Sequence, residues 1–208
     1  MTNTVRILIV AALAAALAAG PAIATETSPT GTLERYLQKA KQDYLQKDVK
    51  AASEEMHKAA EWMKSEAAAA KGKGKEALAA SGREIEKLSV ELKKEAVKSV
   101  KEIEMVSARA YQALATNSHV KSAEAWSKKE FKKAGEELEA TADALGKAYT
   151  WAGQEVKAGT QEAIRESKQL SERLKEGSGR ASAEAERTLK KMEQEIRAFG
   201  RGIAKQSS

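Results

Sequence analysis

The sequence predicts an all-α protein, an antiparallel helical bundle with long helices built from two duplicated helical-hairpin units. Composition is the first reason: 32% of the 208 residues are charged and only 4% are aromatic, which is typical of long helices. Both prolines, Pro21 and Pro29, lie near the start, so no proline interrupts a helix after Thr30. Apolar residues recur at three- and four-residue steps and never alternate over a useful length, which favours helices over strands.

An internal repeat is the third reason. Residues 47–60 (KDVKAASEEMHKAA) align with residues 129–142 (KEFKKAGEELEATA), which lie 82 positions later. Six of the 14 positions are identical: Lys47/Lys129, Lys50/Lys132, Ala52/Ala134, Glu54/Glu136, Glu55/Glu137 and Ala60/Ala142. The same offset continues weakly downstream, where apolar residues again align in pairs: Leu88/Leu170 and Leu92/Leu174. This register predicts the duplication of a unit that contains one short and two long helices.

The first residues have the pattern of a secretory signal peptide. Residues 1–6 carry one positive charge, residues 7–19 are an unbroken apolar run, and Ala22 and Ala24 suit a cleavage site that needs small side chains. A permanent membrane anchor is the weaker alternative, because about 20 apolar residues are needed to span a bilayer. We therefore expect cleavage after Ala24, a periplasmic or secreted protein, and a flexible tether over residues 25–31.

The first unit is expected over residues 32–116. A short amphipathic helix begins at Thr32, and Asp48 is the N-cap of a second helix that fades by Lys71, where two glycines follow. Residues 82–116 are expected to form one long helix. Its apolar stripe recurs at helical spacing: Ile85, Leu88, Leu92, Ala96, Val100, Ile103, Ala110 and Leu114.

The second unit is expected over residues 117–208. Asn117 and Ser118 are expected to break the long helix, a short helix follows over residues 119–128, and Glu130 starts the next helix. That helix presents an apolar face that matches its copy in the first unit and extends as far as Val156: Phe131, Ala134, Leu138, Ala142, Leu145, Tyr149, Ala152 and Val156.

The last segment, residues 180–205, has the spacing of a coiled-coil helix. Its apolar residues alternate steps of four and three: Ala185, Leu189, Met192, Ile196, Phe199 and Ile203. That pattern is a heptad seam of about two and a half heptads, and it favours packing against another helix. Residues 177–179 (Gly-Ser-Gly) are either a turn or an interruption of one continuous helix.

Two resemblances rest on the first hairpin. Bulky and small residues stand at the spacing of one tetratricopeptide unit: Tyr36, Ala40, Ala52, Met56 and Ala59. Copies 82 residues apart cannot stack as repeats of about 34 residues do, so this resemblance implies a hairpin and not an array. Residues 44–52 (YLQKDVKAA), with Met56 and Ala59, also resemble secreted Ala/Lys-rich helical-bundle proteins of bacteria, including the YfdX-like group. That resemblance implies a fold but no activity.

No catalytic, cofactor-binding or metal-binding residue is expected. Cysteine is absent, which removes disulfides, thiolate catalysis and cysteine-ligated zinc. His57 and His119 are the only histidines, and both are expected to be ordinary surface or boundary residues. Glu54 and His57 give one E-x-x-H spacing, but a di-metal carboxylate bundle needs that motif twice, and the second copy has Glu136 and Glu139 instead.

The charge pattern gives no sign of a polyanion-binding face. The net charge of +6 comes from 36 basic and 30 acidic residues, which are interleaved as on a solvated helix surface. Residues 71–75 (KGKGK) are the basic run expected to be mobile, as a solvated loop between helices, and three charges give little counterion release on nucleic acid. A nucleic-acid partner is therefore not expected.

These observations favour a non-enzymatic exported protein that acts by protein binding or self-assembly, with envelope stress as one setting. The alternative is a stress protectant or lipid-surface-binding protein of the late-embryogenesis or apolipoprotein type, whose partner would be a membrane surface. The long charge-laced helices favour this alternative, whereas the duplicated aromatic and apolar positions favour a specified core. No small-molecule substrate and no cofactor is identified.

Overall fold

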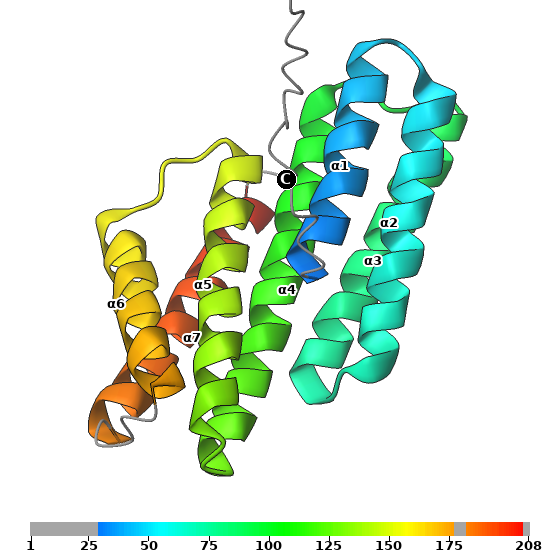
Figure 1. Ribbon diagram of the computed structural model, residues 1–208. Helices are drawn as coiled ribbons and strands as arrows, with labels where there is room; N and C mark the ends of the chain where they lie inside the picture. The colour runs from blue at the N-terminus through cyan, green and yellow to red at the C-terminus, as the bar shows by residue number, and fades with distance from the viewer. Residues whose placement is uncertain (1–28, 177–181, 206–208) are drawn as a thin grey trace, which may run out of the picture.

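The computed structural model describes residues 29–176 and 182–205 (Figure 1). Over these residues the chain forms seven α-helices and no strand, which confirms the all-α helical bundle. The helices are α1 (Pro29–Leu45), α2 (Val49–Ala69), α3 (Gly72–Lys93), α4 (Val100–Ser127), α5 (Phe131–Ala152), α6 (Ala158–Lys175) and α7 (Ser182–Ala204). The expected signal peptide, the first part of the expected tether and residues 177–179 lie outside the described residues.

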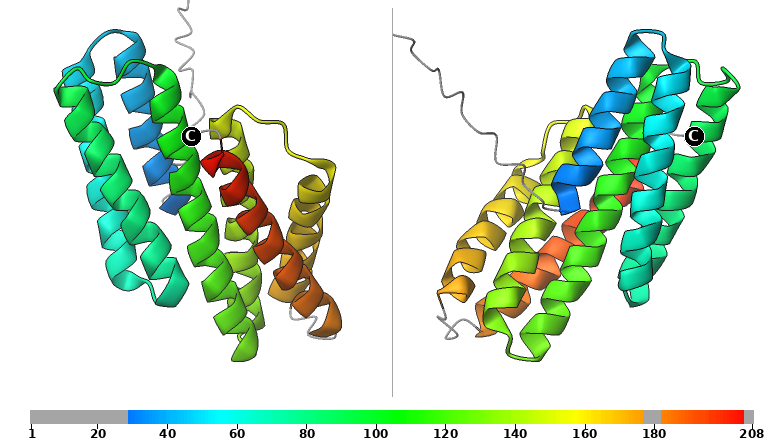
Figure 2. Two further views of the ribbon diagram at one scale, coloured as in Figure 1. Left: turned by 180° about the vertical axis from the view of Figure 1, so that it is seen from behind. Right: turned by 45° about the vertical axis from the view of Figure 1, so that its right-hand side comes forward.

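The helices form two four-helix arrangements that share α4 (Figures 1 and 2). In the first bundle, α1, α2, α3 and α4 pack in a ring, with α1 returning against α4. In the second bundle, α4, α5, α6 and α7 pack in the same cyclic order, with α7 returning against α4. Consecutive helices run antiparallel in both bundles. None of the described helices is long and apolar enough to cross a membrane.

The helix boundaries follow the 82-residue offset found in the sequence. Four pairs of boundaries lie 82 positions apart: the ends of α1 and α4 at Leu45 and Ser127, the starts of α2 and α5 at Val49 and Phe131, the ends of α3 and α6 at Lys93 and Lys175, and the starts of α4 and α7 at Val100 and Ser182. At this offset α1 corresponds to residues 111–127 of α4, and α7 corresponds to residues 100–122 of α4. Each bundle contains the same succession of helices.

The turn that opens each repeated segment has the same backbone conformation. Lys47 and its counterpart Lys129 have φ angles of 65° and 61°, in the left-handed region that closes a helix. The Lys47 N–H donates to the Tyr44 carbonyl at 2.9 Å, and the Lys129 N–H donates to the Trp126 carbonyl at the same distance. Asp48 then caps α2 as expected, because its carboxylate accepts the Ala51 N–H at 3.0 Å.

The expected long helix over residues 82–116 is wrong. α3 ends at Lys93 and α4 begins at Val100, with Ser99 and Glu102 forming a capping box at the new start. The apolar stripe concealed the break because Ala96 keeps the helical spacing between Leu92 and Val100, although it lies exposed in the connection between the helices. Val97, which is next to Ala96, is the residue of this connection that is buried.

The expected break at Asn117 and Ser118 is also wrong. α4 continues without interruption to Ser127, so the expected boundary between units lies inside a helix, and residues 119–128 are not a separate helix. Asn117 is buried under the start of α3, and this tertiary contact outweighs the weak helix propensity of asparagine. Two further ends differ: α1 already begins at Pro29, a residue suited to a first helical turn, and α5 stops at Ala152 before Gly153, whose φ is 64°.

The heptad seam of the last segment lies inside the second bundle. Its residues on α7 are buried apart from Leu189, which is partly buried, and α7 packs on α4, α5 and α6. The Phe199 ring lies 4.6 Å from the Tyr149 ring of α5. The seam therefore packs against helices of the same chain.

A polar cluster joins the two bundles across α4. The hydroxyl of Tyr111 on α4 donates to the Glu34 carboxylate on α1, and Nζ of Lys147 on α5 lies 3.5 Å from the same carboxylate. Burial by itself would raise the pKa of Glu34, but hydrogen bonds from Tyr111 and Gln38 and the charge of Lys147 hold it below its ordinary value. Three helices from both bundles therefore meet at one charged group.

Candidate binding groove

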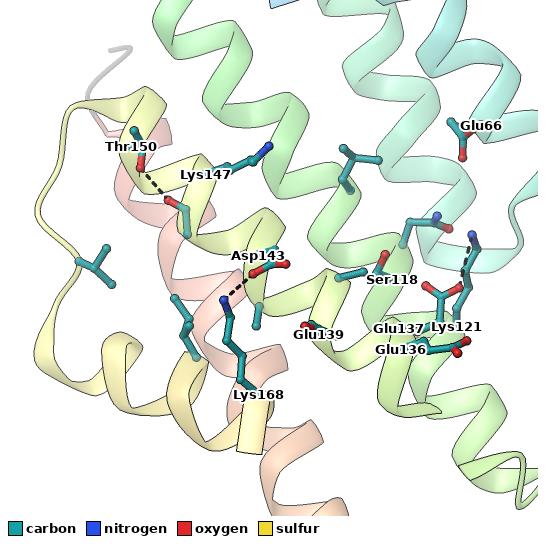
Figure 3. Close-up of a pocket in the computed structure, with 17 residues that line it drawn as sticks. Glu66, Ser118, Lys121, Glu136, Glu137, Glu139, Asp143, Lys147, Thr150 and Lys168 are labelled. Carbon is teal, nitrogen blue, oxygen red and sulfur yellow. Dashed lines mark hydrogen bonds and ion pairs between the residues drawn. The ribbon is translucent and has the colours of Figure 1, made fainter. Parts of the chain in front are cut away.

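A groove of about 890 Å³ runs across α5 in the second bundle (Figure 3). Its walls come from α4 and α6, one edge from α2, and one end from the connection between α5 and α6. The corresponding α2–α3 hairpin has a two-residue connection, residues 70–71, whereas residues 153–157 connect α5 to α6. Because the last residues of α3 and α6 correspond, the shorter helix α6 (18 residues against 22) lacks the first turn that α3 has.

One close contact explains why α3 has this first turn and α6 does not. A Cβ atom on Gly74 of α3 would lie 2.6 Å from Oδ1 and 3.1 Å from Cα of Asn117, so only glycine permits this approach to α4. The corresponding residues of the second bundle are Val156 and Phe199. Their volume does not allow such an approach, so α6 begins only at Ala158 and Val156 lines the groove instead.

The opposite end of α6 lies closer to α5 than its counterpart lies to α2. A Cβ atom on Gly135 would lie 2.8 Å from the Ser171 carbonyl oxygen. In the first bundle these positions hold Ser53 and Ser89, and the Ser53 hydroxyl donates to the Ser89 carbonyl at 2.9 Å. α5 and α6 thus converge at Gly135 and separate toward the loop before α6, as Figure 1 shows. The groove is a consequence of this wedge.

Carboxylates outnumber lysines around the groove. Its lining includes five carboxylates and three lysines: Glu66, Glu136, Glu137, Glu139, Asp143, Lys121, Lys147 and Lys168. Nζ of Lys168 lies 2.6 Å from Asp143, and Lys175, next to the groove, pairs with Glu139. Glu66 and Glu136 form no ion pair with the residues that the structure describes. These two carboxylates lie at the end of the groove nearest α2 (Figure 3).

Glu137 has an unfavourable environment. Burial raises its pKa, and Nζ of Lys121, its nearest cation, lies 3.9 Å away. The corresponding Glu55 of the first bundle is paired with Lys58 at 2.8 Å, but the second bundle has Ala140 where Lys58 stands in the first. Glu137 therefore lacks the lysine that pairs with Glu55 in the first bundle, although the Ser118 hydroxyl donates a hydrogen bond to it.

The floor of the groove is apolar and has room for side chains. Leu114 of α4, Val156 of the connection between α5 and α6, and Ile164 of α6 contribute apolar surface. Gly146 of α5 lines the groove, and a Cβ atom there would meet no neighbouring residue within 4 Å. Apolar floor and charged edges together suit an amphipathic segment rather than a small polar molecule.

The structure places the candidate site residues that the sequence suggested on two different bundles. Glu136, Glu137 and Glu139 line the groove, whereas Glu54 and His57 lie on the first bundle beside α3. The E-x-x-H spacing and its counterpart are thus on different bundles, and they do not converge on one site. Sequence reasoning missed Asp143, Gly146 and Lys168, because their approach depends on how α5 and α6 pack.

His119 has a packing role. Its Nε2 donates to the Leu189 carbonyl of α7 at 2.9 Å, since a carbonyl can only accept. Burial lowers the pKa of His119, so the neutral ring is favoured at this position. This contact ties α7 to α4 in the second bundle.

Comparisons with protein-family models, with curated proteins and with solved structures each found no match. The resemblance to secreted Ala/Lys-rich helical-bundle proteins is therefore still a prediction from the sequence.

Proposed function

We propose that this protein acts by binding a protein partner, and that the groove across α5 holds a basic amphipathic segment of that partner. The excess of carboxylates around an apolar floor is the observation that carries the proposal. Lysine or arginine side chains of the partner would pair with Glu66 and Glu136 and would provide Glu137 with a closer cation. Such charge pairs set specificity and association rate, while apolar residues on the floor supply affinity.

In this proposal the chain is exported, is cleaved after Ala24 and catalyses no reaction. The periplasm or the exterior of the cell is the compartment in which it meets its partner, and envelope stress is one setting. Self-assembly is the less favoured form of partner binding, because the heptad seam on α7 is buried in its own bundle. Pairing of seams between two copies would require α7 to leave α4.

The lipid-binding alternative requires a larger rearrangement. Among the described residues, Leu45 and Val90 are the large hydrophobic side chains that are exposed, and they do not form a continuous apolar face. A lipid surface would therefore bind the apolar faces of these helices only after a bundle opened. A charged groove that is already formed favours a protein partner instead.

The proposal is tested with two labelled peptides of equal length and apolar content, one carrying lysines and the other glutamates on the polar face. Fluorescence anisotropy with the whole chain should show binding of the lysine peptide only. Gly146→Leu should abolish binding by filling the floor, since a side chain fits there without displacing the backbone. Gly202→Leu on α7, where a Cβ atom also meets nothing within 4 Å, is the matched control and should bind normally.

A second pair of variants separates the groove from general electrostatic attraction. Glu136→Lys should weaken binding of the lysine peptide about tenfold, because a repulsion replaces one attractive charge pair at the exposed edge of the groove. Glu54→Lys makes the same charge change at the corresponding exposed position of the first bundle and should have little effect. Equal loss in both variants, or normal binding by Gly146→Leu, would show that the groove is not the binding site.

A further inference from the structure

Three potential metal ligands meet on the outer surface of the first bundle. His57 and Glu61 are four residues apart and share a face of α2, and Glu86 approaches from α3. One ligand atom of each lies within 4.8 Å of the other two, and no other such group of three is found among the described residues. His57 Nδ1 lies 2.9 Å from the Glu86 carboxylate. Glu86 could not be found from the sequence, because it lies 29 positions after His57.

We propose that His57, Glu61 and Glu86 bind a divalent transition-metal ion that links α2 to α3. One imidazole and two carboxylates match zinc and its neighbours better than magnesium or calcium, which prefer oxygen ligands alone. Bonds from such an ion to its ligand atoms are about 2.0–2.2 Å long. The ligand atoms of His57, Glu61 and Glu86, which lie within 4.8 Å of one another, must therefore move closer together to bind one ion. Small rotations of three partly exposed side chains bring them to that spacing.

The second bundle already has a cation at the corresponding place. The positions that match His57, Glu61 and Glu86 hold Glu139, Asp143 and Lys168, and Lys168 Nζ of α6 lies 2.6 Å from Asp143 of α5. A built-in lysine thus links the two helices there. In the first bundle the residue on α3 is a carboxylate instead, and it contacts the His57 ring, so an added cation could link the two helices there.

Lys64 fills this role only in part. Its Nζ lies 2.6 Å from Glu61 but 3.9 Å from Glu86, and it does not reach across to α3 as Lys168 reaches across to α5. The second bundle has Gly146 at the position of Lys64. Lys64 therefore competes with a metal ion for the two carboxylates, and its removal should strengthen metal binding.

The helices hold the ligands in place, and solvent reaches them. The Ser53 hydroxyl donates to the Ser89 carbonyl at 2.9 Å, and the Ser89 hydroxyl donates to the Ser53 carbonyl at 3.0 Å. These two bonds fix the spacing of α2 and α3 one turn away from His57. An open depression lined by His57 and Glu86 adjoins the cluster, so a hydrated ion can enter, and positions not taken by protein atoms remain for water.

Isothermal titration of the whole chain with zinc chloride, without a histidine tag, tests the site. We expect one ion per chain, at least tenfold weaker binding in His57→Gln and in Glu86→Gln, and several-fold tighter binding in Lys64→Gln. Asp143→Asn, at the position of the second bundle that matches Glu61, should bind zinc like the unchanged chain. Far-UV circular dichroism should show that every variant has kept its helices.

Imidazole NMR locates the ion independently of affinity. Zinc should shift the ring resonances of His57 and leave those of His119 unchanged. Zinc should also raise the melting temperature of the unchanged chain but not that of His57→Gln, because an ion held between α2 and α3 stabilises the folded state. A zinc shift at His119, or undiminished binding in either ligand variant, would overturn the proposal.

Discussion

The first bundle closes its α2–α3 hairpin, whereas the second opens its α5–α6 hairpin, although both have the same helix order and matching boundaries. Gly74 against Asn117 lets α3 start close to α4, and Val156 with Phe199 prevents the same approach by α6. Gly135 meanwhile brings the other end of α6 onto α5. The comparison teaches that differences at three positions accompany the change from a closed hairpin to a groove, while the architecture stays the same.

The two bundles also treat equivalent charges differently. Glu55 has a lysine at 2.8 Å, whereas Glu137 has one only at 3.9 Å and a raised pKa. Conversely, the second bundle links its helices through Lys168, where the first bundle places Glu86. Each bundle therefore lacks a cation that the other contains. The proposed basic segment of a partner would supply a cation near Glu137, and the proposed metal ion would supply one near Glu86.

The largest effect is expected from Gly74→Val, which puts the residue of the second bundle into the first. The new side chain would collide with Asn117, including its backbone, so the free energy of unfolding should fall by about 3 kcal/mol, as for severe overpacking. Urea unfolding followed by circular dichroism measures the loss. Gly146→Val, where a Cβ atom meets no neighbour within 4 Å, is the control, and equal losses in both variants would contradict the explanation of the closed hairpin.

Gly135→Ser makes the reverse exchange. Its Cβ atom would lie 2.8 Å from the Ser171 carbonyl oxygen and 3.1 Å from Cβ of Leu174, so α6 must move away from α5. We expect the free energy of unfolding to fall by about 2 kcal/mol in the same urea measurement. Ser53→Gly, measured alongside, should cost about 1 kcal/mol through one lost hydrogen bond. An unchanged stability of Gly135→Ser would show that the close approach of α5 and α6 is not needed.

Glu137→Gln and Glu55→Gln should change stability in opposite directions at pH 7. Because burial raises the pKa of Glu137 in the folded protein, its charged form opposes folding. That cost is full above the raised pKa, declines as the pH falls through it, and is gone only below the ordinary pKa of glutamate. Glu137→Gln should therefore stabilise at neutral pH and have no effect below that ordinary pKa. Glu55→Gln should destabilise by up to about 1 kcal/mol, since it breaks the ion pair with Lys58. The free energy of unfolding of both variants, measured in urea over a series of pH values, tests this prediction. A loss of stability in both variants at pH 7 would contradict it.

The smallest effect is expected from Asp143→Asn, which breaks the ion pair with Lys168. Half of the Lys168 side chain and 44% of the Asp143 side chain are exposed, so the pair should contribute about 0.5 kcal/mol or less. Added salt should remove the difference from the unchanged chain, because exposed charges are screened. A difference that persists in concentrated salt would mean that Asp143 has a further role in the packing of α5 and α6.

Local signals predicted several features of the fold correctly. The N-cap at Asp48, the restart near Glu130 and the apolar faces of α2 and α5 follow from chemistry within a few residues of each position. Other predictions failed where a distant contact decided the outcome. Asn117 continues a helix because Gly74 packs on it, and Ala96 keeps the spacing of the apolar stripe although it lies exposed in the connection between α3 and α4.

The candidate sites were predicted less well than the helices. The sequence drew attention to Glu136, Glu137 and His57 through their repeat and their spacing. It could not pair His57 with Glu86 or Asp143 with Lys168, because each pair joins two helices that are separate in the chain. Sites of this kind depend on the packing of neighbouring helices, which single-helix periodicity does not specify.

By itself the sequence determined that the chain is helical and that its segments recur every 82 residues, because helix propensity, apolar spacing and capping are properties of neighbouring residues. Only the tertiary structure decided that α4 belongs to two bundles, that α7 packs inward and that one hairpin opens into a groove. The physical reason is close packing: whether two helices can approach depends on the volumes of residues such as Gly74 and Val156, together with those of the residues opposite them.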